Sequence, residues 1–413
     1  MIKKRKSKRR RQTKRRQAKR SPRDARFVKK FDLKKYFFLF GVFILTILLL
    51  YSFVILSGIS TRDILSENLS RHSFLSSAGG DLEKTMFIIE RERPSGRGIA
   101  DVYVLLNNER KGNSIVIYIP GSLYFSGLEG DFGSPIPISS LRYAGDFLQE
   151  DRGVEYSFWQ LNEILGLRAE NYVWITPEAY TIINEVYGDI DDIKDRYKED
   201  YILQRGDSLT NAFLRLHAMS SQYSFLKTIT NVRNVKGMDE YIYSNLSFTG
   251  AMNKIGSYRR IVGDTQTLVI DLSSPRYSID QLSDQGGQVR SINISEYDKA
   301  LRRNFIDIID RGLERERVRV EVYNGSGSPG KAGLFARRIL NNGCDVVRFG
   351  NAPESLERTQ VYVSDDREFR NSLNVVDEIL FSRYELLDER PSFMTTGDIV
   401  VILGEDILQM EVF

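Results

Sequence analysis

The stretch YFFLFGVFILTILLLYSFVIL, residues 36–56, decides how the rest of the chain is arranged. It is 21 residues long, and only Gly41, Thr46 and Ser52 are not large and apolar. A helix of this length rises about 30 Å, which matches the hydrocarbon core of a bilayer. A cleaved signal peptide is the alternative, but the run exceeds the usual apolar core of about 7–15 residues and no small-x-small cleavage site follows it closely. The sequence therefore predicts a single transmembrane helix over 36–56.

The charges lie unevenly on the two sides of this stretch. Before residue 36 there are 19 Lys and Arg residues and 2 Asp residues, a net charge of +17, so the remainder carries −13 of the overall +4. Positive flanks stay on the cytoplasmic side of a bacterial membrane. We therefore predict that residues 1–35 form a disordered cytoplasmic arm in contact with membrane lipid, and that the main body lies outside the cytoplasm. Nucleic-acid binding by the arm is less favoured, because no aromatic residue interleaves the basic ones before Phe27.

The chain beyond the apolar stretch reads as a polar stalk, 57–81, followed by alternating strands and helices. Short runs rich in aromatic and β-branched residues predict strands, and apolar residues at helical spacing predict helices. The expected strands cover 85–91, 100–106, 114–119, 171–175 and 267–272. The expected helices cover 138–147, 156–165, 177–186, 206–232 and 295–314, with helix and loop at 240–257 and an exposed loop or boundary at 281–290. This order predicts an α/β fold with helices packed on a sheet.

Residue types for metal or nucleophilic chemistry are sparse. Cys344 is the single cysteine, so it forms no internal disulfide, and its apolar surroundings predict a small buried side chain. His72 and His217 have no ligand spacing around them. Glu129 and Asp131 in a Gly-rich loop would suit acid–base chemistry or Mg²⁺, but a solvated surface loop is the simpler interpretation. No metal site is predicted from this pattern.

Several stretches, taken in order, resemble the LytR–CpsA–Psr family. They are ADVYVLLNNERKGNSIVIYIP (100–120), SSLRYAGD (139–146) and WQLNEILGLRAENYVWITPEAYTIINEVYGDIDDI (159–193). The resemblance covers about residues 83–250 and implies a divergent α/β sandwich domain over 82–280. The family transfers glycopolymers from a polyprenyl-diphosphate lipid to peptidoglycan outside the membrane. Arginines there bind the diphosphate and acidic residues hold Mg²⁺.

The chain departs from the family's charged motifs. The family's Arg-Ser-Asp is Ile99-Ala100-Asp101, its Pro-Arg-Asp-Thr is Pro120-Gly121-Ser122-Leu123, and its arginine-rich helix is represented by 219–226 without arginine. Asp101, the one retained position, is the candidate catalytic residue. Arg97, Arg142 and Arg205 are the candidates for a rearranged diphosphate-binding set. The resemblance therefore implies a non-catalytic binding or scaffold protein of wall-glycopolymer assembly, with an active, Mg²⁺-dependent transferase as the alternative.

A linker and helix, 281–317, leads to a final unit, 318–413. VEVYNGSGSPGKAG (320–333) and VVILGED (400–406) resemble the small carboxyl-terminal domain that often follows the family's main domain. Gly325–Ala332 nearly fits a phosphate-binding P-loop, but Ala332 replaces the hydroxyl that would ligate Mg²⁺. Gly325, Gly327 and Gly330 are therefore interpreted as a tight turn whose free amides could bind an anionic wall group.

The partners implied are membrane lipid, a polyprenyl-phosphate lipid or wall polymer, and other envelope proteins. No cofactor is expected apart from Mg²⁺ in the transferase alternative.

Overall fold

The computed structural model describes most of the chain. The described residues are 33–59, 61–65, 80–93, 96–127, 133–193, 211–238, 240–263, 267–283, 286–381, 383–393 and 395–410. The chain divides into two units, Met1–Leu50 and Tyr51–Phe413. The predicted basic arm up to residue 32 and most of the predicted stalk, 66–79, lie outside the described residues.

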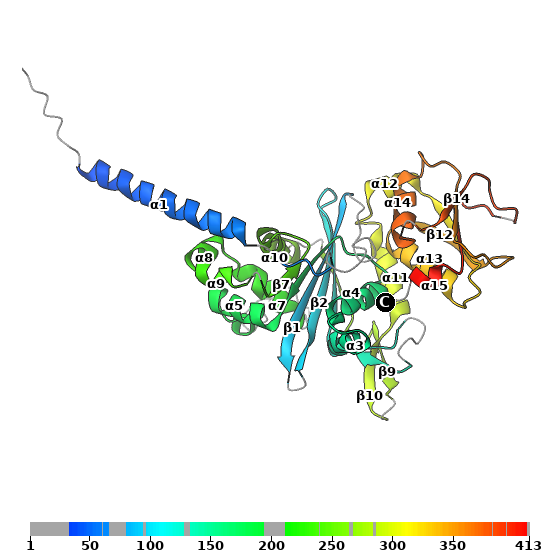
Figure 1. The fold of residues 1–413 in the computed structure, drawn as a ribbon, viewed down its shortest axis with the longest axis horizontal. Coiled ribbons are helices and arrows are strands. Elements are labelled where there is room, and N and C mark those ends of the chain that lie inside the picture. Colours follow the sequence, from blue (N-terminus) through cyan, green and yellow to red (C-terminus); the bar gives the residue numbers. More distant parts are fainter. Residues whose placement is uncertain are drawn as a thin grey trace, which may run out of the picture. The chain divides into compact units, whose positions relative to one another are not determined.

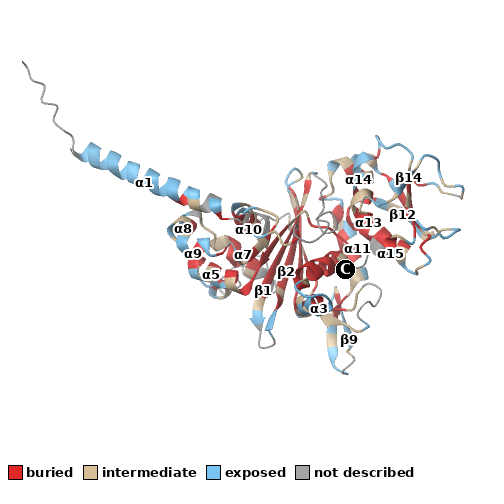
Figure 2. Cartoon of the chain, in the orientation of Figure 1, coloured by how far each residue is buried: buried red, intermediate tan, exposed pale blue. Residues whose placement is uncertain are grey.

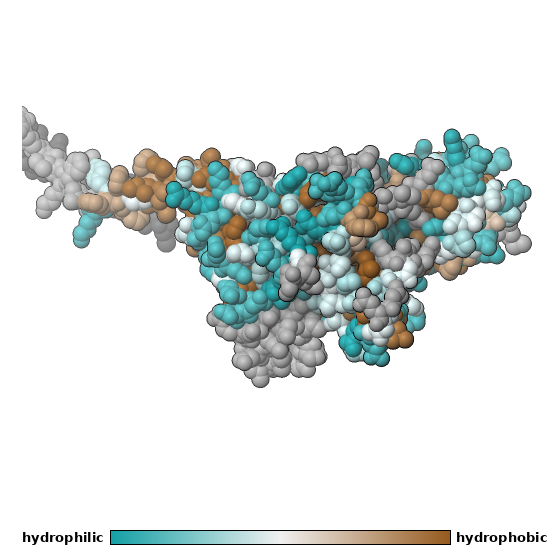
Figure 3. Space-filling model, turned by 60° about the horizontal axis from the view of Figure 1, so that its bottom comes forward, coloured by the Kyte–Doolittle hydropathy of each residue, from teal (hydrophilic) through white to brown (hydrophobic). Residues whose placement is uncertain are grey.

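Helix α1 (Leu33–Gly58) contains the whole apolar stretch 36–56. Its segment Lys34–Ile55 is long and apolar enough to cross a membrane. The large apolar side chains along the helix are exposed (Figure 2), and they form a hydrophobic surface in the space-filling view (Figure 3). Apolar surface of this extent is normally covered by lipid or by another protein.

The main body contains a six-stranded mixed sheet in the order β7-β6-β1-β2-β3-β8. Strands β1, β2 and β3 form an antiparallel meander, while β6 runs parallel to β1 and β8 runs parallel to β3. The strands are β1 (Leu82–Arg93), β2 (Gly96–Asn108), β3 (Asn113–Pro120), β6 (Asn171–Ile175), β7 (Ile242–Ser244) and β8 (Thr267–Asp271). All five strands predicted for this domain are confirmed. Strand β7 was predicted as helix and loop, because three residues are too few to show an alternating pattern.

Helices cover both faces of this sheet (Figure 1). One face, called the α4 face, carries α3 (Leu141–Leu148) after a short 3₁₀ turn (Ile138–Ser140), α4 (Gly153–Leu165) and α11 (Ile294–Phe305). The other, called the α7 face, carries α5 (Pro177–Tyr187), α7 (Asn211–Gln222), α8 (Phe225–Thr230), α9 (Val232–Lys236) and α10 (Phe248–Gly263). Successive β1 residues alternate between the two cores, so Met86 and Ile88 lie on the α4 face and Phe87 and Ile89 on the α7 face. The predicted α/β fold is confirmed.

Two predicted helices are interrupted. The described part of the predicted helix 206–232 contains α7, α8 and the first residue of α9, and the backbone at Ser224 is extended between α7 and α8. The predicted helix 295–314 ends at Phe305, and a separate helix α12 (Arg311–Glu316) follows. Asp310 caps α12 by accepting a hydrogen bond from the Gly312 amide at 2.6 Å. Apolar spacing continued across both breaks, so periodicity alone did not reveal them.

A second sheet packs against the α4-face core. Its order is β5-β4-β10-β9, with β4 (Tyr124–Phe125), β5 (Ile136–Pro137), β9 (Ser278–Leu282) and β10 (Gln288–Ile292). The stretch 281–290, predicted as a loop or boundary, is therefore part of an antiparallel hairpin whose second strand bridges to Tyr124. Half of the strand residues in this hairpin are exposed, and their polar composition is typical of a loop, so the strands were not predicted.

The carboxyl-terminal domain has a five-stranded sheet in the order β12-β11-β15-β13-β14. Its elements are β11 (Arg319–Asn324), α13 (Lys331–Asn341), β12 (Asp345–Asn351), β13 (Gln360–Val363), α14 (Arg370–Ile379), β14 (Glu385–Leu387), β15 (Ile399–Leu403) and α15 (Ile407–Met410). The predicted burial of Cys344 is confirmed, and burial raises the pKa of its thiol to about 12. Such a thiol is a small core side chain rather than a nucleophile.

Polar side chains of α13 cap the carboxyl end of α4. The hydrogen bonds run from Arg337 to Glu163 O (2.7 Å) and Ile164 O (2.6 Å), from Asn341 to Leu165 O (3.0 Å), and from Asn342 to Gly166 O (3.2 Å). Arg337 Nε also pairs with Asp298 of α11 at 2.8 Å. The last carbonyls of a helix lack partners within the helix and carry partial negative charge, so cationic donors there are favourable. We call this contact the α4–α13 junction.

Candidate functional site

Asp101 lies on β2 beside an irregularity in its pairing with β1. The register shifts between Ile89 and Glu90, so that Ile89 faces Asp101 whereas Glu90 faces Ile99. Asp101 is two residues before Tyr103 on β2, so the alternation of the strand places its side chain on the α7 face. One carboxylate oxygen of Asp101 accepts a hydrogen bond from the Tyr118 hydroxyl at 2.9 Å. The other forms an ion pair with Arg215 of α7, and Asp101 is only 2% exposed.

The ion pair continues into a chain of four charged side chains. Arg215 Nε lies 3.4 Å from Asp191, and Asp191 lies 2.7 Å from Arg91 Nη2 on β1. Arg91 also donates to the Tyr180 hydroxyl at 2.6 Å, with its guanidinium 4.6 Å from the centre of the tyrosine ring. We call Asp101, Arg215, Asp191 and Arg91 the Asp101 network. Segments far apart in the sequence supply it, and they meet at one end of the sheet.

The protonation states of the network follow from burial and from its opposite charges. Burial lowers the pKa of Arg215, but Asp101 and the neighbouring tyrosines raise it, and the net direction is upward. Burial and the Asp101 carboxylate raise the pKa of Tyr118, which keeps its proton and its donor role. With two arginines and two carboxylates, the network is electrically neutral. An anion could bind the arginines only in place of their carboxylates.

The four members of the network differ in their access to solvent. The side chains of Asp101 and Arg215 are 3% and 13% exposed, whereas those of Arg91 and Asp191 are 29% and 38% exposed. A ligand would therefore meet Arg91 and Asp191 first. Within the described residues, Arg91 Nε is buried without a hydrogen-bond partner, which leaves one donor of this guanidinium unused.

The predicted arginines Arg97 and Arg142 hold other carboxylates. Arg97 forms an exposed ion pair with Glu178 at the start of α5. Arg142 contacts both oxygens of the buried Glu90, at 2.8 and 2.7 Å. Glu90 follows Ile89 on β1, so its side chain points to the α4 face. Arg142 belongs to α3, which covers that face. The Arg142–Glu90 pair therefore lies on the opposite side of the sheet from Asp101. Arg205 lies outside the described residues.

Sequence reasoning missed Arg215, Arg91 and Asp191. Two signals were available for the arginines. Arg215 interrupts the otherwise apolar run 212–216 of α7, and Arg91 is two residues beyond Ile89, on the strand face that also carries Phe87. For Asp191, in the helical segment 190–193 that follows α5, no comparable signal existed.

The donor set around Asp101 does not fit Mg²⁺. A divalent cation is held by free carboxylate or carbonyl oxygens, but one oxygen of Asp101 accepts from Tyr118 and the other faces a guanidinium. The second carboxylate, Asp191, lies between two arginines. In the described part of the chain there is no group of three or more His, Cys, Asp or Glu side chains that could hold a metal ion. The loop residues Glu129 and Asp131 lie outside that part.

The glycines of the carboxyl-terminal loop occupy positions that require glycine. Gly327 and Gly330 have φ values of 72° and 82°. A Cβ on Gly325 would come within 3.0 Å of the Leu403 carbonyl oxygen. Hydrogen bonds link Asn324, Ser326 and Ser328 within the loop. This geometry accounts for the glycines as a strand-to-helix turn, while anion binding there stays a prediction.

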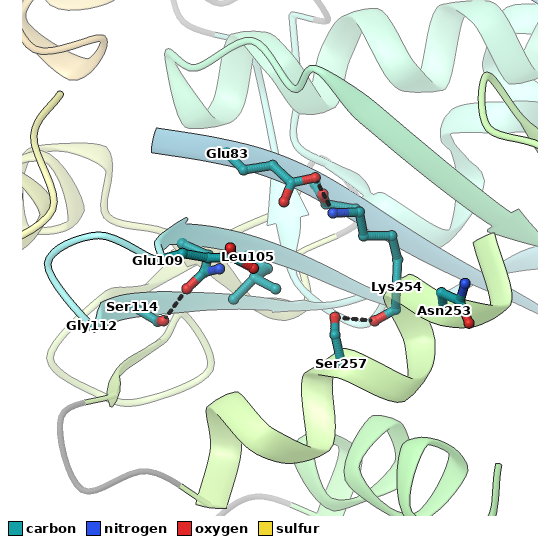
Figure 4. A pocket seen from close by; sticks show the side chains of 10 residues that line it. Glu83, Leu105, Glu109, Gly112, Ser114, Asn253, Lys254 and Ser257 are labelled. Carbon is teal, nitrogen blue, oxygen red and sulfur yellow. Dashed lines mark hydrogen bonds and ion pairs between the residues drawn. The ribbon is translucent and has the colours of Figure 1, made fainter. Parts of the chain in front are cut away.

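A polar cavity of about 370 Å³ lies at the other end of the sheet (Figure 4). Along β2, Asn107 at its wall is six residues from Asp101, or roughly 20 Å at about 3.3 Å per residue. The polar groups of this cavity pair with one another: Lys254 with Glu83, and Ser114 with Asn107 at 2.8 Å. We call it the Glu83 cavity.

Comparison with known proteins supports one part of the resemblance directly. Residues 317–406 match the family model described as LytR cell envelope-related transcriptional attenuator, which confirms the predicted carboxyl-terminal domain. No curated protein matches the sequence.

Solved structures resemble the chain only distantly. TagT bound to LI-WTA is 13% identical, with 58% of this chain and 98% of that chain covered and a TM-score of 0.35. TagV of Bacillus subtilis is 12% identical, with 56% and 98% covered and a TM-score of 0.39. The LytR-CPS2A-psr family protein YwtF (TagT) with bound octaprenyl pyrophosphate lipid is 11% identical, with 60% and 96% covered and a TM-score of 0.32. At these sequence identities and TM-scores, the solved structures are only distantly similar to this chain.

Proposed function

We propose that the protein is a membrane-anchored, extracytoplasmic component of the bacterial cell envelope that binds its ligand without transferring it. Helix α1 would be the anchor, with the basic arm inside the cell and residues 57–413 outside. The match of residues 317–406 to a cell-envelope family supports the compartment. The single-pass arrangement is supported by the apolar segment Lys34–Ile55 and by the +17 charge that precedes residue 36.

One observation carries the non-catalytic assignment: both carboxylate oxygens of Asp101 are engaged within the protein. Tyr118 occupies one and Arg215 the other. Transfer chemistry on a diphosphate needs positive charge that becomes available as negative charge develops on the leaving group. Here the charge of Arg215 is balanced by Asp101 and Asp191, and that of Arg91 by Asp191. Release of Arg215 would leave the buried Asp101 carboxylate without its cation, which costs about 3–5 kcal/mol for a buried pair.

The proposed ligand is a lipid-linked wall polymer or its polyprenyl-phosphate carrier. Two of the distantly similar solved structures contain ligands of this kind: TagT bound to LI-WTA, and YwtF (TagT) with bound octaprenyl pyrophosphate lipid. In this chain, the partly exposed Arg91 and Asp191 would be the point of contact. An envelope protein bound by the main body is a further expected partner of such a scaffold.

The arrangement of charges around Asp101 supports the alternative, an active transferase. Asp101 stands where the family has its motif aspartate, and two arginines converge near it although neither was predicted. Under this alternative, ligand binding would open the network and free Arg91 and Arg215 together.

The two functions are separated by a release assay. The full-length protein in detergent is mixed with a polyprenyl-diphosphate-linked glycan, Mg²⁺ and peptidoglycan, and the released lipid carrier is measured. We expect binding of the lipid-linked glycan and no release above the protein-free control. Mg²⁺-dependent release that is abolished in Asp101→Asn would overturn the non-catalytic assignment and establish the alternative.

The membrane arrangement has its own test. Protease is added to intact spheroplasts and to lysed cells, and fragments are detected through a tag after Phe413. We expect digestion of the main body in intact spheroplasts. Protection in spheroplasts with digestion after lysis would contradict the proposed orientation.

A further inference from the structure

The Glu83 cavity lies between one end of the central sheet and helix α10 (Figure 4). On β1, Thr85 and Glu83 are two and four residues before Phe87, so their side chains point to the α7 face, which α10 covers. Hydroxyl, amide and charged side chains form most of the lining, and Leu105 is its one large apolar member. The surface of the cavity is therefore suited to a ligand that forms many hydrogen bonds.

Thr85 is buried in the wall of this cavity without a partner for its hydroxyl. It is 1% exposed, and its side chain forms no hydrogen bond with any residue that the structure describes. Leaving a buried polar group without a partner costs about 1–3 kcal/mol, and most such groups therefore have one. A ligand in the cavity would supply the missing partner of Thr85.

The two pairs of side chains in the cavity also leave hydrogen-bonding groups unused. Glu83 accepts from Lys254 and from Asn171 through the same oxygen, Oε1, so its Oε2 has no partner among the described residues. The Lys254 ammonium has three donors and uses one of them on Glu83. Asn107 accepts from Ser114 through Oδ1, which leaves its Nδ2 as a donor. The cavity thus offers both donors and acceptors.

The charges of the lining favour a neutral ligand. Glu83 and Lys254 neutralise each other, and the exposed Glu109 of the β2–β3 turn is the one further charge in the lining. An anion would meet two carboxylates, whereas the only ammonium is already paired. A cation would find one solvent-exposed carboxylate, and such contacts contribute little.

The space beside the cavity keeps this balance. A neighbouring hollow of about 620 Å³ shares Glu83, Asn107 and Glu109 with it. In that hollow Asp81 pairs with Arg110 at 3.2 Å. Burial raises the pKa of Glu170, its remaining acidic residue, to about 7, so this group carries only part of its charge at neutral pH.

We propose that the Glu83 cavity binds a neutral sugar unit. A sugar hydroxyl both donates and accepts, so the hydroxyls of one ring can satisfy Thr85, the unused oxygen of Glu83, and the unused donors of Lys254 and Asn107 together. Hydrogen bonds to the two charged groups are the stronger ones and fix the orientation of the ring. The volume of about 370 Å³ lies at the lower end of the roughly 300–1,000 Å³ typical of ligand pockets, which suits a single ring.

The test uses the full-length protein in a detergent without a sugar headgroup, and isothermal titration calorimetry. The neutral probes are glucose, galactose, mannose and N-acetylglucosamine. The 6-phosphate and the 2-amino form of the best hexose are the matched anionic and cationic probes. We expect at least one neutral sugar to bind at millimolar concentration. The phosphate should bind at least about tenfold more weakly, because it meets Glu83 and Glu109, and the amine should bind no more tightly than its parent.

Variants locate the site and separate binding from stability. Glu83→Gln should weaken sugar binding at least about tenfold, because a charge-assisted hydrogen bond is lost. Thr85→Val should weaken it about three- to tenfold, by one neutral hydrogen bond. In urea denaturation without sugar, Thr85→Val should not lower the midpoint, because the hydroxyl that it removes has no partner in the described structure. Thr249→Val, on α10 outside the cavity, is the control and should leave binding unchanged.

Three results would overturn the proposal. One is the absence of binding by all four neutral sugars at tens of millimolar. Another is a phosphate or amine form that binds more tightly than its neutral parent, since the cavity would then select charge. The last is full sugar binding by a folded Thr85→Val variant, which would place the sugar elsewhere. None of these measurements involves the Asp101 network, so the proposed function and this site stand or fall separately.

Discussion

The Asp101 network and the α4–α13 junction both bury arginines, but they satisfy them with different partners. At the junction, Arg337 donates to two main-chain carbonyls of α4 and to Asp298, and its side chain is 9% exposed. In the network, Arg215 meets two carboxylates, and the Arg91–Asp191 end of the network reaches solvent. A main-chain carbonyl at a helix end can neither rotate away nor take up a proton, whereas a carboxylate can do both. The partners of Arg337 in the junction therefore include main-chain groups with a fixed position and no titratable proton, whereas the side-chain partners of Arg215 in the network are both titratable carboxylates.

Arg337→Ala should produce the largest effect, because it removes three interactions at once. The buried Asp298 would lose its cation, and two helix-end carbonyls would lose their donors. Breaking a buried pair in this way costs about 3–5 kcal/mol in the free energy of unfolding, which urea denaturation of the full-length protein measures.

The control for this prediction is Arg358→Ala. Arg358 pairs with Glu385 on the surface of the same domain, and both side chains are largely exposed. We expect no measurable change in its denaturation midpoint. Equal denaturation midpoints for Arg337→Ala and Arg358→Ala would show that the α4–α13 junction contributes no more to stability than a surface ion pair.

Asp101→Asn and Arg215→Met test whether the network behaves as one unit. Each substitution leaves a charge or a polar group of the pair without its partner, and we expect a loss of about 2–4 kcal/mol for each. The double variant should lose less than the sum, with a coupling of at least about 1 kcal/mol, because the pair is then removed together. Urea denaturation of the unmodified protein, the two single variants and the double variant gives the free energies for this double-mutant cycle. Additive losses would mean that Asp101 and Arg215 do not depend on each other.

Glu170 should make stability depend on pH beside the junction. Its folded-state pKa of about 7 lies above the unfolded value near 4.5, so the folded state binds more protons between these values. Its contribution is fully present below about pH 4.5 and is lost as the pH rises through 7, by about 3 kcal/mol. Glu170→Gln should remove this part of the slope in thermal melts, and Glu109→Gln should not. A slope that Glu170→Gln leaves intact would assign it to other groups.

Gly330→Ala should have the smallest effect. Gly330 has a φ of 82°, and an L-residue in this left-handed region loses about 1–2 kcal/mol. Gly333 is the matched control: it lies inside α13, where a Cβ would meet Phe349 at an ordinary 3.7 Å. Gly333→Ala should be neutral or should stabilise the protein by up to about 1 kcal/mol. Urea denaturation decides, and a stable Gly330→Ala variant that has lost phosphate binding would support the anion-binding interpretation of this loop.

The regular elements were predictable because their signals are local. Strands β1 to β3 appeared as dense runs of β-branched and aromatic residues, and the end of α4 was marked by Gly166, which has a φ of 61°. Strand β7 and the β9–β10 hairpin were missed, since β7 is short and half of the hairpin's strand residues are exposed. In each case the missing information was tertiary contact rather than residue type.

The candidate site was only half predictable, because ion pairs depend on which elements the fold brings together. Asp101 could be singled out from its motif position, but its partner Arg215 comes from a helix more than a hundred residues later. Arg142 was a reasonable candidate until the strand alternation placed its partner, Glu90, across the sheet. A charged residue within an apolar run, as at Arg215, would have been the better guide.

The parallel pairing of β3 with β8 has a consequence for how the protein is made. Ser114 on β3 pairs with Thr267 on β8, so the edge of the meander stays unpaired until the chain has been synthesised far beyond it. An unpaired edge exposes a row of amide and carbonyl groups that another chain can join. During synthesis the incomplete chain therefore passes through an interval in which this edge can pair with another chain.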